Sequence, residues 1–194
     1  MNCAKHVDLS ALFAPFKSAG LTLPNRIVMA PMTRCFSPGG VPGPDVASYY
    51  RRRAENEVGL IITEGTWIPH EGASNDANVP QIHGAAALAG WQRVVQEVHA
   101  AGGKIVPQLW HVGLILKPIL NNLFDAPADP EHRHMGPSGI AGGIGYTLKH
   151  GLRAMTRMDI DSVIEAYCAA ASTAFQCAAG SLRQPETYRW GQRF

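Results

Sequence analysis

The sequence predicts an α/β fold in which parallel strands alternate with helices that pack outside the sheet. Three short apolar runs, typical of buried parallel strands, lie at about 26–32, 58–65 and 104–110. Amphipathic helical patterns lie between these runs and after the last one. The strands begin roughly 30 to 45 residues apart, which leaves room for a helical crossover between each pair.

The first strand is predicted at 26–32, where four consecutive apolar residues begin at Ile27. Such a run is expected of a parallel strand that is covered on both faces. Pro31 has no N–H to donate, so regular pairing should stop there. Thr33 and Arg34 then lie just beyond the carboxyl end of the strand, where parallel α/β folds place their ligands.

A loop rich in Gly and Pro, 37–44, leads from this strand to the first predicted helix at 45–56. The arginine run 51–53 within that helix is expected to form an exposed, water-facing surface. The second strand, 58–65, follows directly and ends at Gly65.

The second helix is predicted at 87–101 from a single apolar stripe at helical spacing, which consists of Leu88, Trp91, Val94, Val95 and Val98. Gly102 and Gly103 supply its C-terminal stop. The third strand, 104–110, comes next and ends at Trp110.

The segment 111–157 interrupts this alternation, because it is long and contains many glycines and prolines. A loop of this length is more often a functional lid or excursion than a simple connection. Its glycine-rich part, 139–145, lacks the strand and helix that flank a dinucleotide-binding motif. We therefore interpret that part as a lid or a disordered loop.

A third helix is predicted to begin near Thr156, where Asp159 completes a capping-box-like start, and to end at Gly180. No apolar run follows it, since 181–194 is polar and interrupted by proline. We therefore divide the chain into a main unit, 1–180, and a divergent tail, 181–194. The apolar stripe of this helix is expected to comprise Ile160, Val163, Ile164, Tyr167, Ala171, Ala174 and Phe175.

The composition suits a folded domain, with 46% hydrophobic and 16% charged residues in a chain of 194. The formal net charge of +2 does not favour nucleic acid or membrane surfaces as partners. No run approaches the roughly 18 apolar residues of a membrane span, and the N-terminal segment lacks the apolar core of a secretory signal. The four cysteines show no C-x-x-C spacing, so a cytoplasmic location is expected.

Several motifs, in order, resemble the Old Yellow Enzyme family of FMN-dependent ene-reductases. They are Leu-Pro-Asn-Arg at 23–26, Ile-Val-Met-Ala-Pro-Met-Thr-Arg at 27–34, Gly-Leu-Ile-Ile-Thr-Glu-Gly at 59–65, Gln-Leu-Trp-His-Val-Gly at 108–113 and Gly-Pro-Ser at 136–138. The resemblance implies a (β/α)8 TIM barrel, which needs roughly 250 residues. An incomplete TIM barrel is therefore expected, the N-terminal half with three to four βα units.

The resemblance also implies that FMN lies at the carboxyl ends of the strands. Pro31 and Met32 would line the flavin ring. Thr33 would hydrogen-bond the flavin C4 carbonyl and so tune its redox potential. Gly65 would let a backbone amide approach the ring closely, and Gln108 would bind the pyrimidine edge.

Trp110 would border the substrate cavity. The implied reaction takes hydride from NAD(P)H and delivers it to an activated alkene, an enone or an enal. The family's His-x-x-His or His-x-x-Asn pair, its nearby Tyr and its phosphate-binding strands have no counterpart after Gly180. We therefore assign no catalytic residue.

Two hypotheses follow from this pattern. In the first, the chain represents an FMN-binding, NAD(P)H-dependent ene-reductase. In the second, it is a truncated, catalytically incompetent half-barrel or a fragment that depends on a partner. Unpaired strand edges and an exposed apolar face would then favour self-association.

Each site residue also has a structural interpretation that needs no ligand. Thr33 alone is most often a turn hydroxyl, and Gln108 alone a solvated or capping amide. Gly65 is also typical of a strand-end turn, and Trp110 of wall packing. Only their order and spacing favour a common site.

The histidines at 111, 132 and 134 suggest a metal site by residue type alone. However, Glu131 and Arg133 make the surrounding loop charged, and no cysteine or carboxylate lies at a compelling ligand spacing. We therefore expect solvated histidines and no metal.

Overall fold

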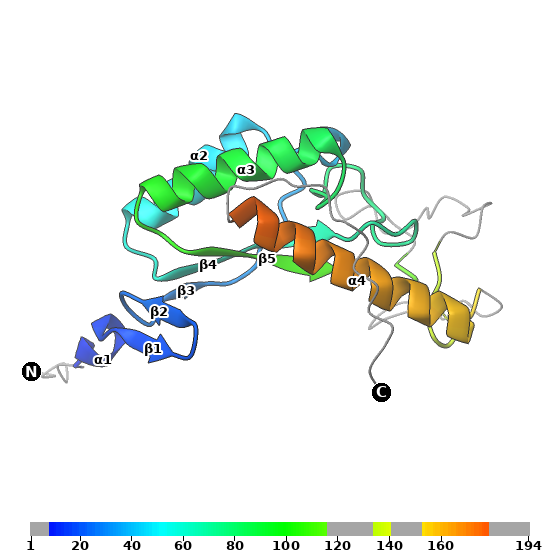
Figure 1. Ribbon diagram of the computed structural model, residues 1–194, viewed down its shortest axis with the longest axis horizontal. Helices are drawn as coiled ribbons and strands as arrows, with labels where there is room; N and C mark the ends of the chain where they lie inside the picture. Colours follow the sequence, from blue (N-terminus) through cyan, green and yellow to red (C-terminus); the bar gives the residue numbers. More distant parts are fainter. Residues whose placement is uncertain (1–7, 116–133, 141–152, 179–194) are drawn as a thin grey trace, which may run out of the picture.

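A parallel sheet of three strands forms the centre of the computed structural model (Figure 1), which describes residues 8–115, 134–140 and 153–178. Its order is β3-β4-β5, and the strands span Val28–Met29, Leu60–Trp67 and Ile105–Trp110. Val28 pairs with Leu60, and Ile61 pairs with Ile105. The predicted α/β fold with parallel strands is confirmed.

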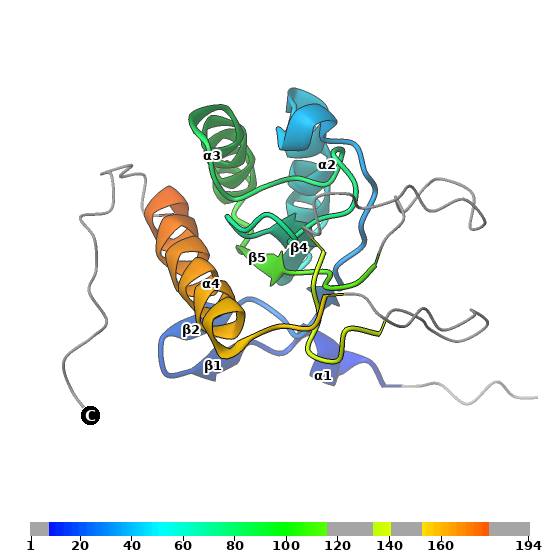
Figure 2. The ribbon, with the colours of Figure 1, turned by 90° about the vertical axis from the view of Figure 1, so that its right-hand side faces the viewer.

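Three helices alternate with these strands, as the apolar periodicity predicts. Helix α2, Pro44–Glu55, connects β3 to β4, and α3, Ala85–Ala100, connects β4 to β5. Helix α4, Arg157–Ala178, comes after β5 in the chain. Figure 2 shows α2 and α3 side by side over the sheet, with α4 running next to α3 and β5.

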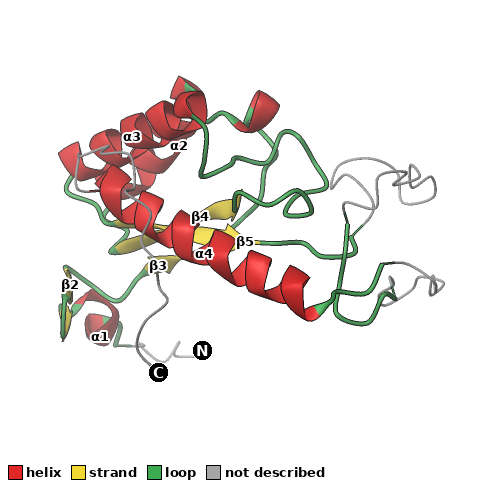
Figure 3. Cartoon of the chain, turned by 45° about the vertical axis from the view of Figure 1, so that its right-hand side comes forward, coloured by secondary structure: helices red, strands yellow, loops and turns green. Residues whose placement is uncertain are grey.

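The N-terminal segment adds elements that the sequence patterns did not predict. A short helix α1, Ser10–Phe13, precedes an antiparallel hairpin of β1, Phe16–Ser18, and β2, Leu21–Leu23. Figure 3 shows these elements away from the helical layer, beyond β3. Three-residue strands are too short to give a period-two signal, so hydrophobic periodicity could not detect them. A single 3-10 turn, Pro38–Gly40, also lies within the predicted loop.

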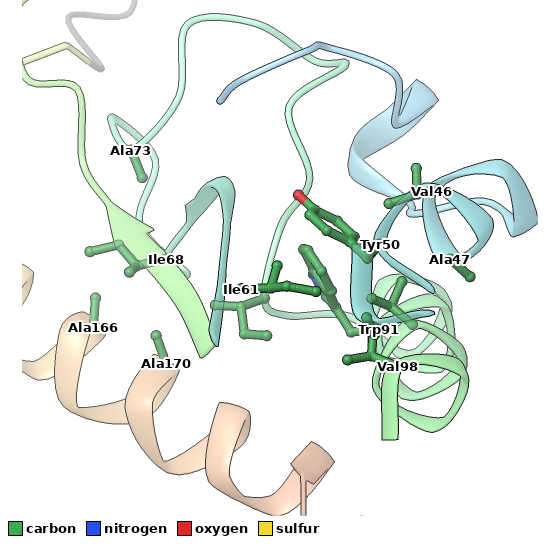
Figure 4. Packing of buried hydrophobic residues seen from close by; sticks show 13 residues of the cluster. Val46, Ala47, Tyr50, Ile61, Ile68, Ala73, Trp91, Val98, Ala166 and Ala170 are labelled. Atoms are coloured by element: carbon green, nitrogen blue, oxygen red, sulfur yellow. The ribbon is translucent and has the colours of Figure 1, made fainter. Parts of the chain in front are cut away.

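The hydrophobic core lies between the sheet and the helices (Figure 4). Tyr50 of α2, Ile61 of β4 and Trp91 of α3 are all buried there. Val94 and Val98 of α3 are fully buried, as the predicted stripe requires. The Trp91 indole N–H donates to the carbonyl of Gln81 at 3.0 Å, so its one polar atom is satisfied.

The predicted coverage of the first strand on both faces is wrong. Val28 of β3 is 47% exposed and Val106 of β5 is 42% exposed. Met29 and Ile105 instead pack against the core below the helices. Within the described residues the helices cover one face of the sheet, and Val28 and Val106 of the two edge strands therefore face away from that packed layer.

The predicted stripe of α4 is wrong at four of its members, since Ile160, Ile164, Ala171 and Phe175 are exposed. Ile164 is 54% exposed and Phe175 is 77% exposed. The buried positions are instead Ala166, Ala170 and Cys177. The small side chains of Ala166 and Ala170 face the sheet (Figure 4), because the helix packs more closely there than a stripe of larger residues would allow.

The arginine run 51–53 does not form one exposed surface. Arg51 pairs with Glu55 at 2.7 Å and also with Glu97 of α3. The guanidinium of Arg53 lies 3.5 Å from the ring centroid of Tyr49. Only Arg52 of the three is exposed. Arg51 therefore links α2 to α3, and Arg53 packs on Tyr49 of its own helix. Helical periodicity alone did not indicate these contacts.

The predicted ends of two helices are confirmed. At the start of α4, the Thr156 N–H donates to Asp159 Oδ2 at 2.8 Å and the Asp159 N–H donates to Thr156 Oγ1 at 3.2 Å, a reciprocal capping box. At the end of α3, Gly102 has a φ of +78°, a left-handed conformation that glycine adopts without strain.

Candidate functional site

The carboxyl ends of the three parallel strands bring four of the predicted site residues to one edge of the sheet. Thr33 follows β3, Gly65 lies in β4, and Gln108 and Trp110 lie in β5. Gly65 pairs in register with Gln108. Because parallel strands end at a common edge, residues separated by more than 70 positions in the sequence become neighbours.

Thr33 and Gly65 are joined directly. The backbone N–H of Gly65 donates to Thr33 Oγ1 at 3.3 Å. That contact occupies a lone pair of the hydroxyl oxygen, so the hydroxyl proton remains available to an acceptor such as a carbonyl. The sequence predicted the flavin-facing role of Thr33 but not this bond, which leaves the Thr33 hydroxyl proton free to be donated.

Gly65 is needed because of Trp110. A Cβ at position 65 would lie 2.3 Å from Cε3 of the Trp110 indole, too close for two carbon atoms. The flat face of an aromatic ring therefore lies directly against the backbone of Gly65. The structure thus shows that this stretch of backbone accepts a planar ring at contact distance.

Gln108 presents its side chain at the same edge. Its backbone N–H donates to Thr63 Oγ1 at 3.1 Å, which fixes the strand end. Among the described residues, its side-chain amide makes no hydrogen bond, and the side chain is half-buried. Trp110 Nε1 is buried and has no hydrogen-bond partner in the described part of the chain. Both groups can therefore receive a polar ligand.

Pro31 and Met32 lie on the same end of β3, immediately before Thr33. Pro31 is half-buried, whereas Met32 is 50% exposed. An exposed, unbranched thioether side chain suits contact with a flat aromatic surface, because sulfur packs favourably against rings.

Glu64 and Arg34 form a buried ion pair beside this edge. The sequence motifs did not indicate this pair. Arg34 Nη2 lies 2.5 Å from Glu64 Oε1, and the Glu64 side chain has no exposed surface. Tyr50 of α2 accepts a hydrogen bond from the Glu64 N–H at 2.8 Å. The signal was a lone carboxylate in an apolar strand, with an arginine at the end of the neighbouring strand.

Two histidines meet next to Trp110, which the sequence also did not indicate. His111 Nε2 lies 3.1 Å from His70 Nδ1. Burial lowers the pKa of His111 to about 4, with further contributions from His70 and His134. His134 is half-buried. His132 lies outside the described residues.

A metal centre has no candidate among the residues that the structure describes, since no group of three or more His, Cys, Asp or Glu side chains could hold an ion. Cys35 is buried, and burial raises the pKa of its thiol to about 11, with Asp76 and Glu64 adding to the effect. It is therefore a thiol rather than a thiolate at neutral pH. The described helices include none long and apolar enough to cross a membrane.

Comparison with known proteins decides the family. The model of the NADH:flavin oxidoreductase / NADH oxidase family matches residues 11–181. The chain belongs to this family. The match includes all the strand-end residues of the site and every helix of the core. The FMN and reduced nicotinamide expected from the sequence are the cofactors of the family, and the resemblance to the Old Yellow Enzymes is confirmed.

Individual members of the family are similar over most of this chain. 12-Oxophytodienoate reductase 7 of Oryza sativa subsp. japonica is 35% identical over 172 residues, 85% of this chain and 42% of the relative. Chanoclavine-I aldehyde reductase of Penicillium roqueforti is 42% identical over 113 residues, 58% of this chain and 30% of the relative.

Solved structures of the family give the same result. Morphinone reductase in complex with tetrahydroNAD matches with a TM-score of 0.67 and 34% identity, over 86% of this chain and 47% of that one. Old Yellow Enzyme from Pichia sp. AKU4542 matches with a TM-score of 0.70 and 31% identity, over 87% and 43%. This chain thus spans less than half the length of these relatives, which agrees with a partial barrel.

The residues present fit the pyrimidine side of a flavin. Thr33 offers a hydroxyl, and Gln108 offers a half-buried amide with both a donor and an acceptor. This donor set matches the alternating carbonyl and N–H groups of a flavin pyrimidine.

Proposed function

We propose that this chain forms the pyrimidine-binding side of an FMN site and belongs to a NAD(P)H-dependent reductase of activated alkenes, enones and enals. The observation that supports the proposal is that Gly65 connects the other two residues: its N–H donates to Thr33 Oγ1, and it pairs in register with Gln108. A hydroxyl, a backbone stretch without a Cβ and an amide therefore lie together at the edge of a parallel sheet where ligands bind.

Each residue then has a specific role. The Thr33 hydroxyl donates to the flavin C4 carbonyl, because Gly65 already occupies one of its oxygen lone pairs. The amide of Gln108 pairs with the pyrimidine edge, and Pro31 and Met32 line the ring. Removal of any polar partner leaves a buried flavin carbonyl or N–H unsatisfied, which costs roughly 1–3 kcal/mol.

When bound, FMN supplies the two-electron chemistry that carries hydride from the reduced nicotinamide to the β-carbon of the alkene. Trp110 borders the cavity of that alkene, and its indole lies against the Gly65 backbone. The relatives named as reductases of 12-oxophytodienoate and morphinone support small enone substrates for this class. We further propose that the functional unit is 1–180, that 181–194 is a divergent tail, and that the protein is cytoplasmic.

A second candidate function rests on the open face of the sheet. Val28 of β3 and Val106 of β5 are both more than two-fifths exposed, and they lie on the two opposite edge strands of this sheet. Such a face favours association with another polypeptide. In this case the chain is a catalytically incompetent half-barrel that acts only with a partner or as a self-associated form.

A titration of the purified chain with FMN distinguishes the two. We expect quenching of flavin fluorescence, a shifted absorbance band and NAD(P)H-dependent loss of an enone. Thr33→Val and Gln108→Leu should weaken FMN binding about tenfold each, since one hydrogen bond is worth about 1.4 kcal/mol. The matched controls are Thr22→Val and Gln96→Leu. They alter exposed residues outside the site and should leave the affinity for FMN unchanged.

A colourless product that binds no FMN and elutes as a dimer or larger species would contradict the enzyme proposal and support the half-barrel. FMN binding without enone reduction would support the cofactor site and contradict independent activity.

A further inference from the structure

Glu64 is a buried carboxylate next to the proposed flavin site that the roles above do not use. Its side chain has no exposed surface, and it lies in β4 between Thr63 and Gly65. A buried charge is unfavourable unless it is paired and hydrogen-bonded. A carboxylate at this position therefore requires a partner strong enough to hold it there.

Arg34 provides that partner through both its side chain and its main chain. Its Nε and Nη2 atoms donate to Glu64 Oε1 at 3.2 and 2.5 Å. Its backbone N–H donates to Glu64 Oε2 at 3.1 Å. One carboxylate oxygen, Oε2, thus holds the backbone immediately after Thr33, while the other, Oε1, holds the Arg34 side chain.

The main chain of Glu64 is held equally firmly. Its N–H donates to the Tyr50 hydroxyl of α2 at 2.8 Å, and Tyr50 is fully buried. The next N–H, from Gly65, donates to Thr33 Oγ1 at 3.3 Å. Consecutive residues of β4 therefore bind consecutive residues after β3, namely Gly65 to Thr33 and Glu64 to Arg34.

The guanidinium of Arg34 is fixed from another side as well. Its Cζ atom lies 3.7 Å from the ring centroid of Tyr49, and Arg53 packs on the same ring at 3.5 Å. The Arg34 side chain is only 14% exposed. Stacking of this kind favours arginine over lysine, because the guanidinium is planar and forms two directed hydrogen bonds.

We propose that Glu64 is a positioning residue that sets where the Thr33 hydroxyl lies relative to the flavin, acting through the backbone N–H of Arg34. This inference rests on the proposed FMN site. The carboxylate fixes the distance between the ends of β3 and β4, so its loss moves the Thr33 donor relative to the flavin carbonyl. Trp110, which borders the alkene-binding side, lies on β5 and touches Gly65, but it makes none of the hydrogen bonds that hold Thr33 and Arg34.

Glu64→Gln tests the role at nearly constant volume. A glutamine has a single acceptor oxygen, so its NH2 group must face either the Arg34 backbone N–H or the guanidinium, both of which are donors. Glu64→Asp keeps the charge but withdraws the carboxylate by one methylene. Glu55→Gln is the matched control, because it makes the same change in an exposed carboxylate that also pairs with an arginine.

The decisive measurement is a double-mutant cycle with Thr33→Val on FMN affinity and on the reduction potential of the bound flavin. We expect Glu64→Gln to weaken FMN binding about tenfold and to shift the potential, and to add little in the Thr33→Val background. The KM for the enone should stay unchanged. Additive effects in the cycle, or a changed enone KM with an unchanged potential, would overturn the proposal.

A second readout works without the cofactor. In amide NMR spectra of the FMN-free chain, Glu64→Gln and Glu64→Asp should shift the Gly65 resonance and speed hydrogen exchange at Arg34 at least tenfold, whereas Glu55→Gln should not. If no form binds FMN but these shifts occur, the proposed function fails and the positioning role stands. Unchanged Arg34 and Gly65 amides in folded Glu64 variants would reject the positioning role.

Discussion

The Nε2–H group of His111 donates a hydrogen bond to Nδ1 of His70 at 3.1 Å. This bond joins the segment after β5 to the segment after β4. The direction follows from the backbone: His111 Nδ1 accepts the Gly113 N–H at 3.1 Å, so the ring proton is on Nε2. His70 Nδ1 also accepts the Gly72 N–H at 3.3 Å. The Nδ1 lone pair of each ring thus accepts a hydrogen bond and cannot also bind a proton, so both imidazoles are held neutral.

This pair predicts a loss of stability on acidification. Burial lowers the pKa of His111 to about 4 and also lowers the pKa of His70. Below pH 6.5 the unfolded chain binds protons that the folded chain does not. The stabilisation is therefore complete above pH 6.5 and decreases as the pH falls towards 4. Urea unfolding between pH 7.5 and pH 4.5 measures it.

His111→Gln should flatten that pH dependence, while His99→Gln, at an exposed position near the end of α3, should not. A His111 variant with an unchanged slope would show that other groups cause the acid sensitivity.

Gly65→Ala should destabilise the fold by about 1–3 kcal/mol, because the added methyl group would lie 2.3 Å from the Trp110 ring and the ring must shift. The same Gly65→Ala change should cost much less in a Trp110→Leu background, since the smaller side chain at position 110 removes the clash. Equilibrium urea unfolding gives both values. Equal losses with and without the Trp110 indole would argue against the contact as the cause.

Tyr50→Phe should cost about 1–3 kcal/mol in the free energy of unfolding, because it leaves the buried N–H of Glu64 without an acceptor. Tyr49→Phe is its control: the neighbouring ring stays, and among the described residues its hydroxyl makes no hydrogen bond. Thermal unfolding followed by circular dichroism separates the two. Similar midpoints for both variants would refute a specific role of the Tyr50 hydroxyl.

Asp159→Ala should destabilise α4 by about 1 kcal/mol or more, since this carboxylate caps the helix and also pairs with Arg153 at 2.5 Å. Asp161→Ala removes an exposed pair with Arg157, which should change stability by less than about 0.5 kcal/mol. Chemical denaturation of the two variants tests the contrast, and a larger loss from the Asp161 change would contradict it.

The strands and helices were predictable where the sequence carries a long periodic signal. The stripe of α3, with Trp91, Val94 and Val98 buried, repeats often enough to define one face. In α4 the periodicity indicated a helix but favoured Phe175 over Ala170 as a buried residue. Hydrophobicity does not tell how closely a helix approaches its neighbour, which is what selects small residues for the contact.

The site was predictable as a set of positions and not as a network. The motif around Thr33 and the glycine at 65 indicated the ligand-binding edge from the chain alone. The pairing of Glu64 with Arg34, and of His70 with His111, joins residues 30 and 41 positions apart. No local spacing carries such a contact, because it exists only once parallel strands share one edge.

The sequence by itself determined the family, the alternation of strands and helices, and the edge of the sheet proposed to hold the site, because motifs and periodicities are local properties of the chain. Only the tertiary structure decided that Gly65 donates to Thr33, and that a buried carboxylate holds Arg34. It also decided that Val28 faces outwards. These features depend on which strands are neighbours and on which face a helix layer covers, and both are set by packing between distant segments.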